Sequence, residues 1–284
     1  MAVSASAHRV FRYQVLGGKV SGYRFPFLPS CVMCRRRPSS FFTFSWSTSA
    51  FLTSSSVGST QRRSLPIHAS CSNPTNIIIS PARKKELAQV IKKNRLLLIE
   101  DDLYGWLRAE EGGDMISLHD LIGCRSFYIA SLTKCLCPGL RIAYGAVTDD
   151  IKDIMEEGFS NISIKTSSLD AEIMTELLLS GSAQKLLHQK AALAKKTSAL
   201  FDAFFPDLPP QPPSYFRWLP ISDSRPFDQV EKDLLRQGIH IYHSGRFMAS
   251  NHEESSFLRV SLCSAGNTAR LRKGLMIIKN YLNP

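Results

Sequence analysis

The sequence has no long uninterrupted apolar run, and its first part has no acidic residues. No stretch approaches the roughly 18 consecutive apolar residues of a membrane-spanning helix, so insertion into a bilayer is not expected. Residues 1–85 contain twelve Lys and Arg but neither Asp nor Glu, whereas residues 86–284 contain 23 basic and 24 acidic residues. The net charge of +11 therefore comes from the amino-terminal part, and the balanced remainder is not expected to bind nucleic acid.

The basic stretch has the composition of an organelle-targeting leader. Arg35, Arg36 and Arg37 lie among Ser, Thr and Phe with no acidic residue nearby, as in mitochondrial and plastid transit peptides. A disordered tail or an incorrectly assigned start fits the same composition. Residues 1–70 are therefore interpreted as a leader outside the folded part. The corresponding location is a plastid or mitochondrion, and otherwise the cytoplasm.

The seven cysteines do not form a pattern of disulfides or of metal ligands. Cys31 and Cys34 make one C-x-x-C pair inside the leader, but no second pair follows at zinc-binding spacing. The histidines also lack metal-ligand spacing, so no metal site is expected. The remaining cysteines are interpreted as small buried side chains in a reducing compartment. They are Cys71, Cys124, Cys135, Cys137 and Cys263.

The rest of the chain alternates helix and strand signals, which predicts an α/β fold. Ser80 and Pro81 predict the N-cap and first turn of a helix of about three turns. Residues 96–99 follow as an apolar strand buried on both faces, as in a parallel sheet. We expect a large domain over 71–205, ending in a long linking helix, and a small α/β domain over 206–284. Further strands are expected at 126–131, 141–147, 216–219, 239–242 and 257–263, and further helices at 169–205, 227–237 and 267–282.

Lys134 lies in the loop between two of these strands, where open α/β sheets bind ligands. A solvated surface lysine is the plainer alternative. However, Cys135, Leu136 and Cys137 follow it directly, and an apolar setting favours the neutral amine that can attack an aldehyde carbon.

The residues around this lysine carry a family resemblance. Ser131-Leu-Thr133-Lys134, followed by Pro-Gly-Leu-Arg141, resembles the cofactor-lysine motif of class I/II aminotransferases. The spacing is closest to the aminotransferase-like domain of the MocR-type regulators. The resemblance implies the fold-type I transferase fold and pyridoxal 5′-phosphate as cofactor, held covalently by Lys134. Ser131 and Arg141 would bind its phosphate, with Thr133 a weaker candidate for the same role.

Asp101 and Tyr104 form a second motif, just after the strand at 96–99. An acidic turn is the plainer reading of these residues. By resemblance to the family, the Asp101 carboxylate pairs with the pyridine nitrogen of the cofactor and keeps it protonated, while the Tyr104 hydroxyl approaches the ring oxygen. Asp102 is the less favoured neighbour for the role of Asp101.

Asn73, in Asn-Pro-Thr-Asn76, resembles the Asn-Pro-Thr-Gly turn of the family, whose Asn also reaches the ring oxygen. Asn76 stands where the family has glycine, a tolerable change because Asn accepts left-handed backbone angles. Arg259 lies in the middle of a strand pattern, where an exposed position is the plainer reading. The resemblance implies that Arg259 binds the α-carboxylate of the substrate through a bidentate pair.

The resemblance extends over residues 71–282 and implies homodimers when the domain is complete. Complete relatives have a long earlier segment with a phosphate-binding loop and a ring that stacks on the pyridine, and residues 1–70 show neither. We therefore expect an amino-terminally truncated chain with an incomplete large-domain sheet. The leading hypothesis is an aminotransferase that moves an amino group between an amino acid and a 2-oxo acid. The alternatives are a non-catalytic aminotransferase-like protein and an effector-binding fragment of a transcription regulator.

Overall fold

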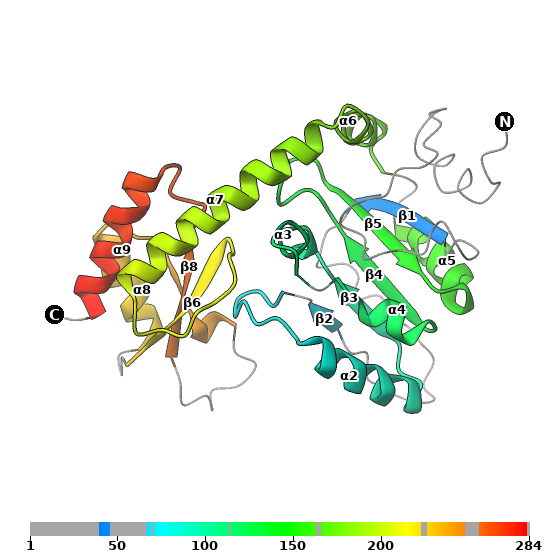
Figure 1. The fold of residues 1–284 in the computed structure, drawn as a ribbon, viewed down its shortest axis with the longest axis horizontal. Coiled ribbons are helices and arrows are strands. Elements are labelled where there is room, and N and C mark those ends of the chain that lie inside the picture. Colours follow the sequence, from blue (N-terminus) through cyan, green and yellow to red (C-terminus); the bar gives the residue numbers. More distant parts are fainter. Residues whose placement is uncertain are drawn as a thin grey trace. The chain divides into compact units, whose positions relative to one another are not determined.

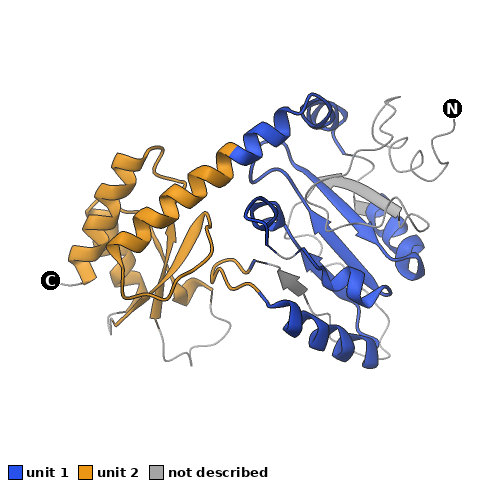
Figure 2. Cartoon of the chain, viewed as in Figure 1, with its two compact units in different colours: residues 1–71, 79–188 blue, residues 72–78, 189–284 orange. Residues whose placement is uncertain are grey.

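The computed structural model describes two compact parts of the chain, which Figure 2 shows in different colours. Unit 1 comprises residues 1–71 and 79–188, and unit 2 comprises residues 72–78 and 189–284. We predicted the domain boundary at residue 205 from the sequence, whereas the two units divide after residue 188, inside the long helix α7 (Ser182–Phe204). The residues described are 40–45, 67–69, 71–113, 115–162, 166–222, 226–247 and 256–282.

Unit 1 is built on a mixed sheet whose described strands have the order β1-β5-β4-β3-β2 (Figure 1). The strands are β1 (Ser40–Ser45), β2 (Ile67–Ala69), β3 (Leu98–Asp101), β4 (Ser126–Ala130) and β5 (Ile142–Val147). Strands β2, β3 and β4 are parallel, while β5 is antiparallel to β4 and β1 is antiparallel to β5. The carboxyl ends of β3 and β4 therefore lie side by side at one edge of the sheet.

Strands β1 and β2 correct one expectation from the sequence. Both lie within residues 1–70, which the composition assigned to a leader outside the fold, yet β1 pairs with β5 and β2 pairs with β3. A basic, acid-poor composition does not exclude strands, because Phe, Thr and Ile all favour extended backbone. The other residues of 1–70, with the predicted transit peptide, lie outside the described residues.

Helices cover both faces of this sheet. One cluster joins Leu98 of β3 to apolar side chains of α2 (Pro81–Lys93) and α4 (Leu118–Ile122). On the other face, Ile99 of β3 packs in a cluster with Met155 and Phe159 of α5 (Lys152–Ile162). Successive side chains of a strand point to opposite faces. Unit 1 also contains α3 (Gly105–Glu110), the 3₁₀ turn η2 (Asp149–Ile151), α6 (Ser168–Leu179) and the beginning of α7 (Ser182–Phe204).

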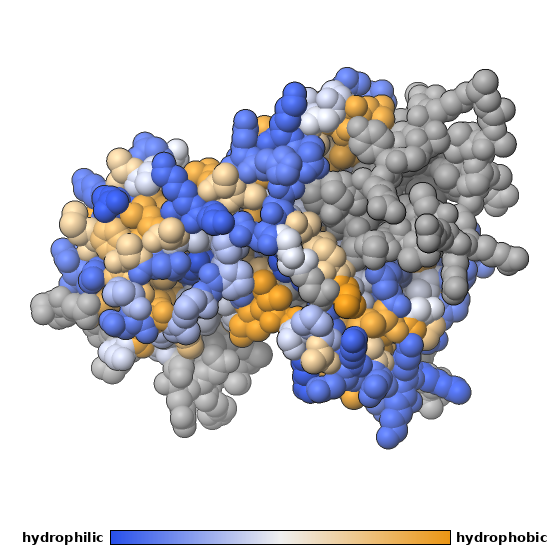
Figure 3. All heavy atoms as spheres, viewed as in Figure 1, coloured by the Kyte–Doolittle hydropathy of each residue, from blue (hydrophilic) through white to orange (hydrophobic). Residues whose placement is uncertain are grey.

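Local signals account for the ends of several helices. The Ser80 side chain accepts a hydrogen bond from the Arg83 amide, and Pro81 occupies the first turn of α2, as predicted. The visible face of α2 is hydrophilic (Figure 3), in keeping with its exposed Arg83 and Lys85. The single helix expected at 169–205 is instead α6 and α7, because Gly181 takes a left-handed backbone angle (φ 71°) that ends α6.

Unit 2 contains a three-stranded antiparallel sheet of described strands in the order β6-β8-β7. The strand expected at 239–242 is shorter and lies at Tyr242–His243. The sheet packs against the second half of α7 and the two other helices of the unit, around a core that includes Phe201, Leu234 and Leu258. Its elements are β6 (Phe216–Ile221), α8 (Phe227–Arg236), β7 (Tyr242–His243), η3 (Ser244–Arg246), β8 (Ser256–Ser261) and α9 (Thr268–Leu282).

The part of the chain that the structure describes has no helix long and apolar enough to cross a membrane. Within the same residues, no cluster of three or more His, Cys, Asp or Glu is arranged to hold a metal ion.

Two adjacent leucines of α8 test the core of unit 2. Leu234 is 0% exposed and lies in the core, whereas Leu235 is 57% exposed. We expect Leu234→Ala to lower the free energy of unfolding by about 2–5 kcal/mol, because it leaves a cavity. Leu235→Ala, on the same helix, should lower it by less than about 1 kcal/mol. Urea unfolding of both variants measures this difference, and equal losses would contradict the assignment of the core.

Candidate active site

Two loops meet at the carboxyl ends of β3 and β4. The first follows Asp101, the last residue of β3, and contains Tyr104, and the second joins β4 to β5 and contains Lys134. Parallel pairing places Asp101 opposite Ile129, near the end of β4. In the second loop the carbonyl of Leu132 accepts hydrogen bonds from the amides of Cys135 (3.1 Å) and Leu136 (2.8 Å), which forms a tight turn around Lys134.

Asp101 and Lys134 lie close enough for their charges to interact. The carboxyl of Asp101 is half-buried, and its Oδ1 accepts a hydrogen bond from the Leu103 amide at 3.2 Å. Burial raises the pKa of Asp101 above its ordinary value, while the Leu103 amide and the positive charge of Lys134 act in the opposite direction. The structure therefore brings together the two residues that the sequence assigned to opposite ends of the cofactor ring system.

Lys134 is exposed, which differs from the apolar setting that its neighbours suggested. The turn directs Cys135 into the core, where its thiol donates to the Leu132 carbonyl, and leaves Lys134 on the outside. Only one of the five body cysteines is buried as expected. Cys71 is half-buried, Cys135 is buried, and Cys124, Cys137 and Cys263 are exposed.

Ser131 and Thr133 are buried with their hydroxyl groups in contact. Ser131 donates to the carbonyl of Ile142 at 2.6 Å and accepts from the Thr133 amide at 3.1 Å. Arg141 is exposed and directly precedes Ile142, at the start of β5. The hydroxyl hydrogen of Ser131 is therefore already donated within the protein, and of the three residues predicted to bind a phosphate only Arg141 is exposed.

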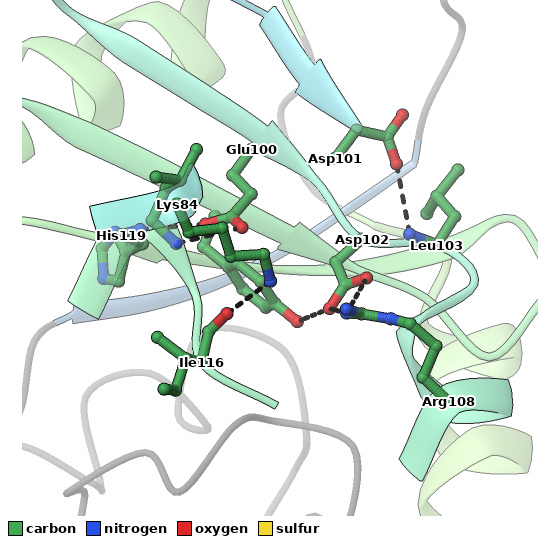
Figure 4. A network of polar contacts seen from close by, with 10 residues as sticks. Lys84, Glu100, Asp101, Asp102, Leu103, Arg108, Ile116 and His119 are labelled. Atoms are coloured by element: carbon green, nitrogen blue, oxygen red, sulfur yellow. Dashed lines mark hydrogen bonds and ion pairs between the residues drawn. The ribbon is translucent and has the colours of Figure 1, made fainter. Parts of the chain in front are cut away.

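Asp102 faces away from Asp101, into a polar network on the other side of β3 (Figure 4). Its carboxylate accepts hydrogen bonds from the Tyr128 hydroxyl at 2.5 Å and from Arg108 Nη2 at 3.2 and 3.4 Å. Burial is the main cause that raises the pKa of Asp102, and the positive charge of Arg108 opposes it. The sequence favoured Asp101 over Asp102 as the partner of the ring nitrogen, and it is Asp101 on which the charge of Lys134 acts.

Glu100 belongs to the same network and was not predicted as a site residue from the sequence. Its carboxylate accepts hydrogen bonds from the amides of Leu118 (3.1 Å) and His119 (2.9 Å) at the start of α4. Burial raises the pKa of Glu100 to about 7, although those two amides oppose the change. The buried Lys84 donates to the Ile116 carbonyl at 2.5 Å, and its charge acts on both Glu100 and Asp102. Three consecutive acidic residues at the end of a buried strand, Glu100 to Asp102, could have indicated such a network.

Asn73 and Arg259 form a second group of site residues, in unit 2. Arg259 Nε donates to Asn73 Oδ1 at 3.0 Å, and its guanidinium lies 4.9 Å from the centre of the Phe216 ring. Asn76 has a positive φ of 60°, as its place in the Asn-Pro-Thr-Asn turn predicted. The structure thus joins two predicted substrate and cofactor residues that lie 186 positions apart.

Residues 48–278 match the sequence model for aminotransferases of class I and II. The chain belongs to this family. It is 28% identical over 213 residues to the uncharacterized HTH-type transcriptional regulator YdeF of Bacillus subtilis, covering 74% of the chain and 46% of that protein. It is 23% identical to the 2-aminoadipate transaminase of Thermus thermophilus, covering 70% and 52%. The chain thus spans about half the length of the curated relatives it matches.

Solved structures confirm the predicted fold. The kynurenine aminotransferase of Pyrococcus horikoshii matches with a TM-score of 0.68 and 17% identity, over 76% of this chain and 56% of that one. The aspartate aminotransferase of Thermus thermophilus with maleate matches with a TM-score of 0.65 and 18% identity, over 77% and 56%. The family and fold are those of pyridoxal-phosphate-dependent aminotransferases, which agrees with the cofactor inferred from the sequence.

Glu100 should make the stability of the protein depend on pH. Its pKa rises from 4.5 to about 7 on folding, so its contribution to stability is present at low pH and is lost as the pH rises between these values. Glu100→Gln has no charge to bury. We therefore expect the free energy of unfolding of the variant to rise relative to wild type by about 2 kcal/mol from pH 5 to pH 8.

Urea unfolding at both pH values measures this difference. Glu157→Gln is the control, because Glu157 is exposed on α5 and should leave the pH dependence unchanged. A difference between wild type and Glu100→Gln that stays constant with pH would show that Glu100 is ionised equally in the folded and unfolded chain.

Proposed function

We propose that this chain is a pyridoxal-phosphate-dependent aminotransferase that moves an amino group between an amino acid and a 2-oxo acid. The observation that supports this function most directly is the juxtaposition of Asp101 and Lys134 at the carboxyl ends of β3 and β4. Membership of the aminotransferase family supports it as well.

The residues of unit 1 fit the cofactor chemically. Burial disfavours the charged form of Asp101, so a cationic ring nitrogen beside it would stabilise the carboxylate. The guanidinium of Arg141 would bind the phosphate, and the Ser131 hydroxyl would first have to give up its hydrogen bond to the Ile142 carbonyl to contribute. Tyr104, half-buried at the start of α3, would donate to the ring oxygen.

Pyridoxal phosphate supplies an aldehyde that takes up the amino group and a ring that stabilises the electron pair at the substrate α-carbon. The protein moves the proton. The amine of Lys134 is exposed at the loop tip and would take the proton from the α-carbon as a general base, then return it as a general acid. Asp101 would hold the proton on the ring nitrogen, which favours loss of the α-proton.

Arg259 would bind the substrate carboxylate. Its Nε is held by Asn73, and its guanidinium is supported by the face of Phe216. Among the described residues, the two terminal nitrogens of Arg259 make no hydrogen bond, so they could form a planar pair with a carboxylate. Asn73 would thus fix the orientation of Arg259.

A second candidate function is binding of cofactor and amino acid without turnover. It is favoured by the relatives described as HTH-type transcriptional regulators, of which YdeF is one. The two functions differ in one measurement. Turnover requires a 2-oxo acid to be released from an amino acid donor, whereas binding alone changes only the absorbance of the bound cofactor.

Replacement of Lys134 tests the proposed function. Wild-type protein with pyridoxal phosphate should show a visible absorbance band, and borohydride should attach the cofactor to Lys134. Lys134→Ala should lose both the band and the attached mass, and transamination should fall by at least about a thousandfold because the general base is missing. Absorbance, mass spectrometry of the reduced protein and a 2-oxo acid assay measure these effects.

Lys196→Ala is the control for Lys134→Ala, because Lys196 is an exposed lysine of α7. It should bind cofactor like wild type. If wild type and Lys134→Ala are indistinguishable after borohydride treatment, Lys134 does not hold the cofactor and the proposed function is lost.

Replacement of Arg259 tests substrate binding. Lysine keeps the charge but cannot form the planar pair, so Arg259→Lys should raise the apparent Kd for amino acid and 2-oxo acid roughly 10- to 100-fold. Titration of the absorbance of the bound cofactor measures this Kd whether or not turnover occurs. Arg236→Lys, at an exposed position of α8, should leave it unchanged. An unchanged Kd in Arg259→Lys would remove Arg259 from the substrate site.

A further inference from the structure

Two consecutive aspartates leave β3 in opposite directions. Asp101 lies on the α5 side and Asp102 on the side of α2 and α4, as the alternation of side chains requires (Figure 4). The amide of Asp102 donates to the Ile129 carbonyl at 2.8 Å, which continues the pairing of β3 with β4 by one residue. Because the two side chains share one stretch of backbone, whatever holds Asp102 also determines where Asp101 points.

Asp102 is held from β4 and from α3. The Tyr128 hydroxyl of β4 donates to one carboxylate oxygen, and Arg108 of α3 donates to both oxygens. The carboxylate also lies directly against Gly105, the first residue of α3, so closely that a Cβ at Gly105 would overlap with it. The Gly105 amide in turn donates to the Asp102 carbonyl at 3.1 Å.

These contacts place Tyr104 as well as Asp101. Tyr104 lies between Asp102 and Gly105, and it is the N-cap residue of α3. The Asp102 carboxylate thus holds the span from Asp101 to Gly105 in place. Asp101 and Tyr104, which are proposed to bind the cofactor, both lie on that span.

Burial raises the pKa of Asp102, and two cations oppose that rise. Lys84 from α2 and Arg108 from α3 are the cations of the network, and Glu100 is its second carboxylate. Tyr128 faces Asp102 from β4, and the half-buried Cys71 also interacts with Arg108 and Asp102. Only a carboxylate offers two acceptor oxygens and a negative charge to Tyr128 and Arg108 together. An amide would remove the negative charge that faces the nearly buried Arg108.

We propose that Asp102 is a positioning residue, which through Tyr128 and Arg108 holds the β3 end so that Asp101 and Tyr104 face the cofactor. This inference rests on the proposed function for the identity of the cofactor. The geometric part of it concerns only residues of unit 1 and can be measured without cofactor.

The Leu103 amide reports where Asp101 points, because it donates to Asp101 Oδ1. Hydrogen exchange at Leu103, followed by NMR on the full chain without cofactor, should be at least tenfold faster in Asp102→Asn than in wild type. Exchange at Leu98, whose amide donates to the Arg125 carbonyl at the other end of β3, should change less than threefold. Asp207→Asn, at an exposed aspartate of unit 2, should match wild type at both amides.

Tyr128→Phe provides the second variant, because it keeps the buried ring and removes only the hydroxyl that contacts Asp102. It should also speed hydrogen exchange at the Leu103 amide by about threefold or more, and it should leave exchange at the Leu98 amide unchanged. If Asp102→Asn speeds exchange at both amides alike, Tyr128→Phe decides the question. Wild-type exchange at Leu103 in Tyr128→Phe, or in a folded Asp102→Asn, would overturn the proposal.

A second measurement links positioning to the cofactor. Asp102→Asn should weaken binding of pyridoxal phosphate about tenfold, and so should Asp101→Asn. If Asp102 acts through Asp101, the double variant should bind no more weakly than Asp101→Asn alone. If the losses of cofactor affinity from the two single variants multiply in the double variant, the two residues act independently, which contradicts the proposal. If wild type binds no pyridoxal phosphate, the proposed function fails, while hydrogen exchange at Leu103 still decides the positioning role.

Discussion

The parallel pairing of β3 with β4 is the constraint on which the candidate site depends. It sets Asp101 opposite Ile129, so that the loop after β3 and the loop after β4 leave the sheet at the same edge. Lys134 belongs to the second of these loops, and its charge acts on Asp101. A register shifted by one residue would turn Asp101 to the face of α2 and α4, away from Lys134.

The same strand divides acidic residues between two chemical environments. Asp101 lies half-buried at the edge where a cofactor would bind, whereas Glu100 and Asp102 lie buried on the other face with Lys84 and Arg108. Burying several charges beneath a sheet is costly unless they are paired, and here the two carboxylates face two cations. The network therefore supports the end of β3, where the proposed cofactor-binding residues would have to be held in a fixed position.

Unit 2 contributes a separate pair, Asn73 and Arg259. Their hydrogen bond joins a turn before the first described helix to the last described strand, so residues far apart in the sequence would contribute to substrate binding. The chain spans about half the length of the curated relatives it matches.

Local and tertiary interactions account for different parts of this protein. The N-cap at Ser80, the left-handed Asn76 and the order of Asp101, Ser131 and Lys134 could be predicted from sequence, because each depends on nearby residues or on a motif. The break between α6 and α7 was missed, although Gly181 is a local signal for it. The exposure of Lys134 could not be predicted, because it depends on the packing that buries Cys135 in the same turn. Nor could the partners of Asp102.

Arg108 and Tyr128 belong to different elements from Asp102, and no periodicity or spacing connects them to it. Sequence by itself determined the family and supplied the site residues that are proposed. Only tertiary structure decided what holds Asp102, because its partners lie on a neighbouring strand and on the helix after β3.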